Sequence, residues 1–239
     1  MESSPQKNSP FTLVLPCYNP PANWEKNVVE SVKAITTLTG ITPELIIVND
    51  GSIRNTETEK SEYIGLSLND FKWISYSQNR GKGYALRQGV AEAKNDLVIY
   101  TDIDFPYLES SFVSLYQTLL QGHDVVPGHR GKDYYSKTPF LRKIISKFLR
   151  WTLKTFLRLP TDDSQCGIKG FNKKGASVFL DTKIDRFLFD LEFIKLASKR
   201  KLKIQTAEVE LKPNIVFSKV SFKILFRESL NFMKVLFRK

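Results

Sequence analysis

The stretch DLVIYTDIDFP, Asp96–Pro106, decides the fold. It begins with a short apolar run and ends with two aspartates, Asp102 and Asp104, separated by one residue. A short apolar run that stops at turn-forming residues predicts a strand buried on both faces, here Asp96–Asp102. The two carboxylates are therefore expected to leave the protein interior together, where this strand ends.

Similar apolar runs lie on both sides of this stretch, and segments with helical periodicity separate them. The other predicted strands are Phe11–Pro16, Glu44–Asp50, Phe71–Ser77 and His123–Gly128. The predicted helices are Trp24–Leu38, capped by Asn23, then Gly83–Lys94 and Glu109–Gln121. This alternation predicts an α/β fold with a mainly parallel sheet and helices on both faces.

Polar residues gather just beyond the ends of these strands. In open sheets of this class, ligands bind outside the carboxyl ends of the strands. The polar residues at these positions are Asn19, Asp50, Asn79, Arg80, Asp102, Asp104, His129 and Arg130. We therefore expect the functional site at this edge of the sheet.

Asp102 and Asp104 are candidate ligands of a divalent cation. Paired carboxylates in a cleft repel each other unless a cation lies between them, and Mg²⁺ or Mn²⁺ takes oxygen ligands and bridges phosphate oxygens. A solvated turn would also carry such a pair, and a lone D-x-D is a weak signal. Its position at the end of a buried strand favours the metal site.

The motif VNDGS, Val48–Ser52, ends the second predicted strand. The carboxylate of Asp50 could accept hydrogen bonds from a nucleobase or a ribose, while Gly51 permits a sharp turn. Taken alone, the motif is better explained by ordinary turn chemistry.

A glycine-rich turn precedes the second predicted helix, in NRGKGYALRQGV, Asn79–Val90. Unpaired N–H groups at the start of this helix, together with the cations Arg80 and Lys82, would suit a diphosphate. A solvated glycine-rich turn explains the same residues equally well. The glycine spacing matches neither a Walker loop nor a dinucleotide-binding fingerprint.

Two further motifs contain reactive side chains. In DDSQCGIKGFN, Asp162–Asn172, Cys166 lacks an evident partner histidine, so we interpret it as a structural cysteine. In RFLFDLEFIKLA, Arg186–Ala197, Asp190 and Glu192 belong to an amphipathic helix. Residues two apart do not share a helix face, so at most one would point into a cleft and the other would be solvated or paired with a cation.

The composition limits the classes of partner and compartment. The 239-residue chain has a formal net charge of +11, which indicates an anionic partner such as nucleic acid, a phosphorylated substrate or an acidic membrane surface. Its two cysteines have no CxxC neighbours, which predicts neither a disulfide framework nor a zinc knuckle and favours a reducing compartment. With no apolar signal core and no apolar run near ~20 residues, we expect a cytoplasmic protein, peripheral on the cytoplasmic membrane face if it is membrane-bound.

Taken together, these motifs resemble the inverting glycosyltransferases of family 2, which have the nucleotide-diphosphosugar transferase (GT-A) fold. VLPCYNP resembles the family's first strand and its P-x-Y-N turn, VNDGS its D-D-G-S motif, and YTDID its metal-binding D-x-D. The similarity is closest to the polyprenyl-phosphate branch, which includes the dolichol-phosphate glucose and mannose synthases. The branch motifs N-x-G-K-G, G-S-R, D-T-Q-C-G-x-K and F-D-x-E read here NRGKG, GHR, DSQCGIK and FDLE.

The resemblance runs from about Thr12 to Ser221 and implies a role for each matching residue. The residues implied to frame the nucleotide are Pro16, Tyr18, Asn19 and Asp50, with Lys82 near the diphosphate. The remaining implied roles are Asp102 and Asp104 for Mg²⁺ or Mn²⁺, Gln165 for the donor sugar, and Arg130 and Arg142 for the acceptor phosphate. Asn49 and His129 depart from the family pattern, where aspartate and serine are usual, and these departures bear on donor choice.

The resemblance implies transfer of a sugar, with inversion, from a donor of the UDP-glucose or GDP-mannose type to a polyprenyl phosphate. A lipid phosphate is already an anion at neutral pH and needs no general base, so arginines that position it would matter most. The alternative acceptor is a glycan hydroxyl, as in polysaccharide synthesis. A carboxylate must then take the hydroxyl proton, and Asp190 is the first candidate.

We expect the chain to divide into a disordered lead (1–10), a single glycosyltransferase domain (11–221) and a basic amphipathic C-terminal helix (222–239). A second basic amphipathic stretch, Leu141–Pro160, lies in the more basic half that follows Gly131. Such helices lie in membrane interfaces or pack on a protein core. Because two occur in a chain of net charge +11, we expect at least one to contact a membrane.

Two other classes of protein are less consistent with the motifs. A nucleotidyltransferase would have a loop rich in glycine and arginine after the first strand, where this chain has CYNPPANW. A basic nucleic-acid-binding protein would account for the net charge, but no binding module is recognisable and the D-x-D would have no explanation. We therefore do not expect nucleic acid as the partner.

Overall fold

The structure is a computed structural model and describes residues 9–131, 161, 163–186 and 188–213. Its strands are β1 (Phe11–Cys17), β2 (Glu44–Asp50), β3 (Phe71–Tyr76), β4 (Leu97–Tyr100), β5 (Val125–Arg130), β6 (Lys169–Phe171) and β7 (Ala207–Val209). Its helices are α1 (Trp24–Thr39), α2 (Thr58–Ser67), α3 (Lys82–Ala91), α4 (Glu109–Leu120), α7 (Lys173–Leu180) and α8 (Phe189–Lys199). The described strands form one sheet in the order β3-β2-β1-β4-β6-β5-β7.

The sheet is mainly parallel, as the sequence predicts. β1 pairs in parallel with β2 on one side and with β4 on the other, so that Val14 has Ile46 and Tyr100 as its neighbours. β6 is the exception among the described strands, because it runs antiparallel to both β4 and β5. The sheet therefore extends to both sides of β1, and the carboxyl ends of β1, β2 and β4 lie at one edge.

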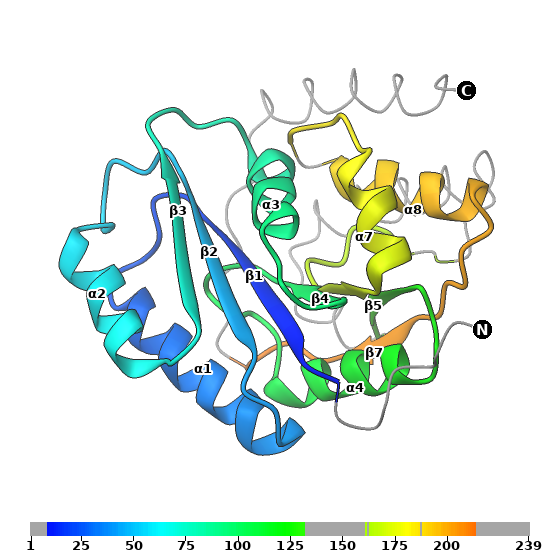
Figure 1. Cartoon of the computed structure of the whole chain (residues 1–239), viewed down its shortest axis with the longest axis horizontal. Coiled ribbons are helices and arrows are strands. Elements are labelled where there is room, and N and C mark those ends of the chain that lie inside the picture. Colours follow the sequence, from blue (N-terminus) through cyan, green and yellow to red (C-terminus); the bar gives the residue numbers. More distant parts are fainter. Residues whose placement is uncertain (1–8, 132–160, 162, 187, 214–239) are drawn as a thin grey trace.

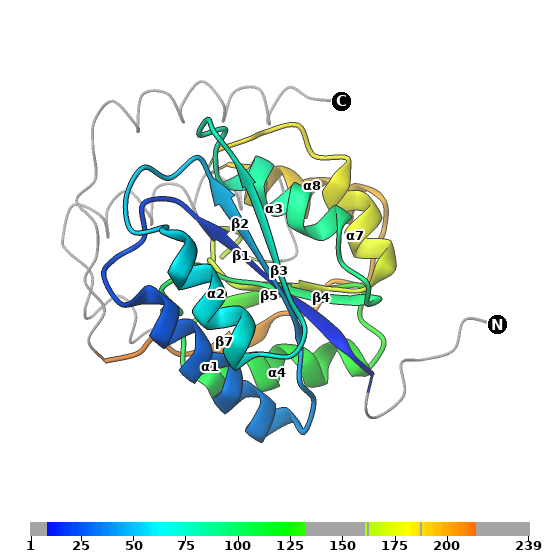
Figure 2. The same ribbon diagram turned by 60° about the vertical axis from the view of Figure 1, so that its left-hand side comes forward.

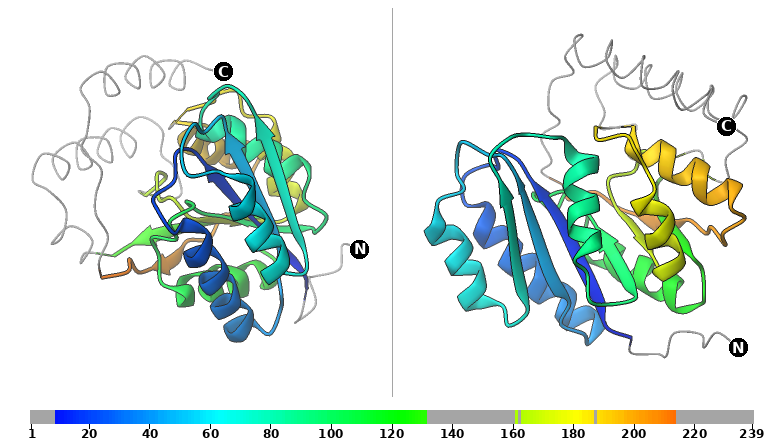
Figure 3. Two further views of the ribbon diagram at one scale, coloured as in Figure 1. Left: turned by 90° about the vertical axis from the view of Figure 1, so that its left-hand side faces the viewer. Right: turned by 45° about the horizontal axis from the view of Figure 1, so that its top comes forward.

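Helices cover both faces of the sheet (Figures 1 and 2). Leu13 and Leu15 of β1 pack with Trp24 of α1 in a cluster that includes α2 and α4. Val14, between them, points to the opposite face and packs in a cluster with α3, α7 and α8. Both faces of β1 are thus buried, which explains the nearly continuous apolar sequence of the central strands. Figure 3 shows the same layers from two further sides.

Several predicted boundaries differ from the structure. β4 ends at Tyr100, two residues before the predicted end, and β5 extends to Arg130 instead of ending at Gly128. α2 was not predicted, because Ile64 is its one buried residue and the segment has little apolar periodicity. Asn23 precedes α1 but makes no side-chain capping hydrogen bond; it adopts a left-handed conformation with φ 60°.

Some predictions fall outside the described residues. These include the lead over residues 1–8, the basic stretch Leu141–Pro160 and the C-terminal helix over residues 222–239. The division into domains therefore stays a prediction. Across the described ranges, no helix has both the length and the apolar character needed to cross a bilayer.

Candidate active site

The turn after β4 carries Asp102 and Asp104 to the carboxyl edge of the sheet. Because β4 ends at Tyr100, both aspartates lie in the turn, where the Phe105 N–H donates to the Asp102 carbonyl oxygen at 3.0 Å. Phe105 has a positive φ of 46°, which bends the chain sharply. The Asn27 side chain donates to the Asp104 carbonyl oxygen at 3.0 Å and so ties the turn to α1.

Lys82, at the start of α3, faces this turn. Its Nζ lies 2.6 Å from Asp102 Oδ1. Burial opposes a charged lysine, but the neighbouring carboxylates of Asp102 and Asp190 raise the pKa of Lys82 above its usual value. Partial burial, followed by the charge of Asp102, raises the pKa of Asp104. The turn after β4 therefore brings the carboxylates of Asp102 and Asp104 close together, and a bound cation would reduce the repulsion between them.

The chemistry of this turn fits a hard divalent ion. Asp102 and Asp104 offer carboxylate oxygens, the donors that Mg²⁺ and Mn²⁺ prefer. Within the described ranges, no group of three or more His, Cys, Asp or Glu side chains forms a complete metal cage. An ion held by these two aspartates would therefore complete its coordination with water and phosphate oxygens, as Mg²⁺ commonly does.

The loop before β6 packs directly against this acidic turn. A Cβ on Gly167 would lie 2.8 Å from Asp102 Oδ2, so only glycine fits there without displacing the carboxylate. The Gly167 N–H donates to the Tyr107 hydroxyl at 3.0 Å. Cys166 is fully buried, and burial raises the pKa of its thiol, which agrees with a structural cysteine. Gln165 is half-buried in the same loop.

A buried ion pair lies beneath the site. Lys169 of β6 is 0% exposed, and its Nζ donates to Asp190 Oδ1 and to the Cys166 carbonyl oxygen, each at 2.6 Å. The Tyr100 hydroxyl also donates to Asp190 Oδ1. Asp190 thus joins α8 to β4 and β6. Because Oδ1 of Asp190 already accepts these two donors, the geometry gives little support to Asp190 as a general base.

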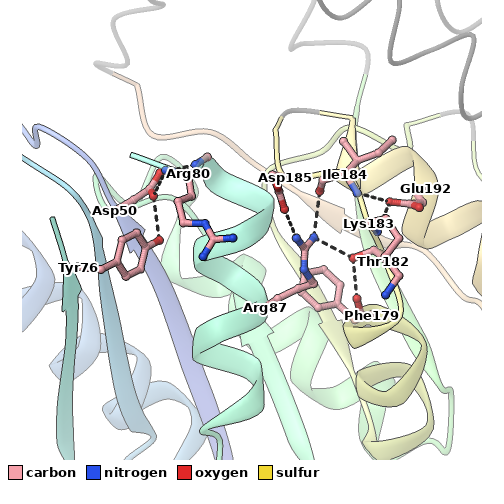
Figure 4. Close-up of polar contacts among 11 residues, drawn as sticks. Asp50, Tyr76, Arg80, Arg87, Phe179, Thr182, Lys183, Ile184, Asp185 and Glu192 are labelled. Carbon is pink, nitrogen blue, oxygen red and sulfur yellow. Dashed lines mark hydrogen bonds and ion pairs between the residues drawn. The ribbon is translucent and has the colours of Figure 1, made fainter. Parts of the chain in front are cut away.

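Asp50 is a buried anchor for the glycine-rich turn. It is 2% exposed, and its carboxylate accepts from the Tyr76 hydroxyl, the Asn79 amide and the N–H groups of Arg80 and Gly81 at 2.7–2.8 Å. Figure 4 shows the Tyr76 hydroxyl and the backbone N–H of Arg80 directed at this carboxylate, while the Arg80 guanidinium points away from it. Asp50 therefore positions the turn that precedes α3, and any effect on a nucleotide is expected to pass through that turn.

Two N–H groups in the first turn of α3 are already paired with the protein, so they are not available to a diphosphate. The Gly83 and Tyr84 N–H groups donate to the Asp185 carbonyl oxygen at 2.7 and 3.3 Å. The helix start therefore binds a protein carbonyl. Of the features predicted for this motif, the Lys82 side chain is the one that reaches the acidic turn.

Hydrogen bonds join the turn after β1 to the turn after β2. The Asn19 N–H donates to Ser52 Oγ, and Asn19 Oδ1 accepts from the Ile53 N–H, both at 2.9 Å. Asn19 is left-handed, with φ 46°, while Pro16 is half-buried and Tyr18 is exposed. Asn49, which departs from the family pattern, donates to Ser75 Oγ and accepts from the Ser52 N–H. An aspartate here could accept in both contacts, with the Ser75 hydroxyl then acting as the donor.

Arg130, the last residue of β5, forms a bidentate ion pair. Its Nε and NH2 donate to the two oxygens of buried Asp163, at 2.9 and 2.5 Å. This pairing fixes the plane of the guanidinium. Arg142, the second predicted acceptor arginine, lies outside the described residues.

Sequence reasoning missed three residues that shape the site: Tyr107, Asp163 and Lys169. Lys169 carried a signal, because a lysine inside the apolar run GIKGF must find a buried partner. Tyr107 and Asp163 carried none, since their partners are distant in the sequence. Of the predicted residues, the structure brings Lys82, Asp102, Asp104 and Asp190 together, and it places Asp50 behind the glycine-rich turn.

Solved structures confirm the fold. Glucosyl-3-phosphoglycerate synthase from Mycobacterium tuberculosis, in complex with Mn²⁺, UDP and glucosyl-3-phosphoglycerate, superposes with a TM-score of 0.65 over 95% of this chain and 78% of that chain, at 18% identity. Mannosyl-3-phosphoglycerate synthase from Rubrobacter xylanophilus also gives 0.65, over 96% and 73%, at 14% identity. The predicted GT-A type fold is therefore confirmed.

Sequence comparisons give the family. A dolichyl-phosphate beta-glucosyltransferase of Trichomonas vaginalis is 25% identical over 97% of this chain and 78% of its own length. The enzyme of the same name from Saccharomyces cerevisiae is 25% identical over 82% of this chain and 64% of its own length. The model of glycosyl transferase family 2 matches residues 12–230. The chain is thus a glycosyltransferase and belongs to glycosyl transferase family 2.

Proposed function

We propose that this glycosyltransferase moves a hexose from a nucleotide-diphosphate donor, of the UDP-glucose or GDP-mannose type, to a polyprenyl phosphate, with inversion and with Mg²⁺ or Mn²⁺. The observation that carries the donor half is the acidic turn of Asp102 and Asp104 facing Lys82 at the carboxyl edge of the sheet. Relatives named dolichyl-phosphate beta-glucosyltransferases support the acceptor half and favour glucose. A structural neighbour bound to Mn²⁺ and UDP is consistent with the donor half.

On the donor side, Asp102 and Asp104 would hold the ion, and Lys82 would lie near the diphosphate. A divalent cation at this position would neutralise the charge that develops on the leaving diphosphate. Pro16, Tyr18 and Asn19 would frame the nucleotide, while Asp50 acts indirectly by fixing the glycine-rich turn. The site would thus place the leaving group between the acidic turn and α3.

On the acceptor side, the geometry around Asp190 favours a group that needs no deprotonation. Asp190 Oδ1 accepts from Lys169 and from the Tyr100 hydroxyl, so Asp190 would be a weaker base for a glycan hydroxyl. A lipid phosphate is already anionic and needs only to be oriented. Arg130, whose guanidinium Asp163 holds in place, and Arg142 would orient it, and Gln165 would lie near the donor sugar.

A polyprenyl phosphate is a membrane lipid, so this acceptor implies that the reaction takes place at a membrane surface. We therefore place the enzyme on the cytoplasmic membrane face as a peripheral protein. The net charge of +11 supports this placement, since anionic lipid surfaces attract basic proteins.

The direct test is transfer of radiolabelled sugar into lipid. The purified protein would be incubated with labelled UDP-glucose or GDP-mannose, Mn²⁺ and a polyprenyl phosphate in detergent, and the organic phase counted. We expect label in the lipid from one donor, and none with EDTA or with the Asp104→Asn variant. Label that enters a glycan primer but never the lipid would replace the lipid acceptor with a hydroxyl. Absence of transfer and of nucleotide-sugar binding would overturn the proposal.

A further inference from the structure

The segment that joins α7 to α8 packs on the glycine-rich turn at the start of α3. The Asp185 carbonyl oxygen of this segment accepts from the Gly83 and Tyr84 N–H groups. A Cβ on Gly81 would lie 2.5 Å from that oxygen, and one on Gly83 would lie 2.6 Å from the Ile184 carbonyl oxygen. Residues 182–185, called here the linker segment, therefore meet the two glycines on either side of Lys82 backbone to backbone.

Arg87 of α3 holds the linker segment from one side. Its guanidinium donates to Thr182 Oγ1 at 3.3 Å and to the Ile184 carbonyl oxygen at 3.0 Å, and it pairs with the Asp185 carboxylate. Figure 4 shows Arg87 reaching from α3 to these groups. The fork of guanidinium donors contacts three residues of the segment, which a lysine could not reproduce.

Glu192 of α8 holds the same segment from the other side. It is 2% exposed, and its Oε2 accepts from the Lys183 and Ile184 N–H groups, each at 2.8 Å. Ile184 thus donates its N–H to α8 and offers its carbonyl oxygen to α3 (Figure 4). A carboxylate with two backbone donors is a strong, charge-assisted contact.

These contacts bear on the donor site through Lys82. The linker segment fixes the first turn of α3 on one side, while Asp50 fixes the preceding residues on the other through the Arg80 and Gly81 N–H groups (Figure 4). Lys82 lies between these two anchors, and its Nζ reaches Asp102 at 2.6 Å. The direction of the Lys82 side chain therefore depends on the place of the linker segment.

We propose that Glu192 and Arg87 are positioning residues: they hold the linker segment on the Gly81–Gly83 turn and so aim Lys82 at the donor diphosphate. Because Lys82 meets a diphosphate only under the function proposed above, this role rests on that proposed function. The two acids of FDLE then have separate tasks. Asp190 neutralises buried Lys169, and Glu192 orders the backbone beside α3.

A double-mutant cycle on UDP affinity separates this role from a purely structural one. UDP binding in Mn²⁺ would be measured by calorimetry for wild type, Glu192→Ala, Lys82→Ala and the double variant, with a melting curve for each. We expect Glu192→Ala to weaken UDP binding about tenfold, the scale on which supporting residues act. In the Lys82→Ala background, the same change should have almost no further effect.

Three more variants complete the test. Glu192→Gln keeps one acceptor oxygen for the two N–H groups and should restore most of the affinity. Glu62→Ala, on the exposed face of α2, is the matched control and should bind UDP like wild type. If Glu192→Ala does not fold, Arg87→Lys serves in its place, since it keeps the charge but loses the fork.

The outcomes distinguish the two proposals. Affinity losses that add fully in the double variant, or wild-type affinity in folded Glu192→Ala or Arg87→Lys, would overturn the positioning role while the function stands. A wild-type protein that binds neither UDP nor another nucleoside diphosphate in Mn²⁺ would overturn the proposed function and the positioning role with it.

Discussion

Two strand ends at the same edge of the sheet carry aspartates in contrasting environments: one carboxylate is buried and the other is partly exposed. Asp50 is the last residue of β2, is 2% exposed and accepts four protein donors. Asp102 lies two residues beyond the end of β4, pairs with Lys82 and keeps 41% of its side chain exposed. A carboxylate still inside the strand must be satisfied by the protein, whereas one in the following turn is available to a ligand. An aspartate near a strand end therefore has a structural role at β2, where it is Asp50, and a proposed ligand-binding role after β4, where it is Asp102.

The largest effect on stability is expected at the β2 end, from Asp50→Ala. The change leaves four donors without their acceptor, three of them in or next to the glycine-rich turn. We expect the free energy of unfolding to fall by about 2–4 kcal/mol, measured by urea denaturation. The matched variant Asp104→Ala should change it by less than about 0.5 kcal/mol. An Asp50→Ala protein of wild-type stability that no longer binds nucleotide would instead make Asp50 a direct ligand.

Gly167→Ala tests the packing at the β4 end. The new Cβ would come within 2.8 Å of Asp102 Oδ2 and must displace either the loop or the carboxylate. We expect Mn²⁺-dependent UDP affinity to fall about 10–100-fold, as when other groups that support a metal ligand are changed. Gly131→Ala, where a Cβ would meet no atom of the described residues within 4 Å, is the control. If Gly167→Ala binds UDP like wild type, the Asp102 carboxylate does not need its present position for Mn²⁺-dependent UDP binding.

The pH dependence of metal binding tests the electrostatics of the same turn. Burial and the charge of Asp102 raise the pKa of Asp104, so Asp104 binds a proton at a higher pH than an ordinary aspartate. The metal needs the deprotonated form, so Mn²⁺ affinity should fall as pH drops through that raised pKa, by at most about tenfold per pH unit. Asp104→Asn should flatten this profile. A wild-type profile that is flat down to the usual aspartate range would contradict the assignment.

The smallest effect is expected from Tyr76→Phe at the β2 end. It removes one of the four donors to Asp50 and leaves the other three in place. Because the carboxylate stays largely satisfied, we expect a loss of about 1 kcal/mol in unfolding free energy, with UDP affinity unchanged. If the free energy of unfolding falls as much as in Asp50→Ala, the Tyr76 hydroxyl alone, and not the four donors together, stabilises the Asp50 carboxylate.

Much of the fold was predictable because local apolar runs dominate it. β1 and β2 are buried on both faces, so their sequences contain almost no polar residue until the strand ends. The position of the site followed from the same pattern, since Asp102 and Asp104 interrupt an apolar run. β6 was harder, because a strand of three residues with two neighbours from distant parts of the chain has no periodicity of its own.

The fate of individual polar side chains was not predictable, because it depends on partners that are distant in sequence. Asp50 meets Gly81 across 31 residues, and Lys169 meets Asp190 across 21. Both acids of FDLE are buried and meet different partners, in agreement with helix spacing that keeps residues two apart on different faces. Each finds its own partners, Asp190 toward β4 and β6 and Glu192 toward the linker segment. Helix spacing alone predicts the relative directions of two side chains, but it does not predict which residues they contact.

The central claim is that the acidic turn after β4 binds the donor diphosphate through a metal, while Asp50, the last residue of β2, does not touch it. Calorimetric titration of UDP into wild-type protein and Asp104→Asn, each with Mn²⁺ and with EDTA, tests this most directly. We expect wild-type protein to bind UDP only with Mn²⁺, and a stably folded Asp104→Asn protein not to bind it. UDP binding of equal strength in EDTA and in Asp104→Asn would contradict it.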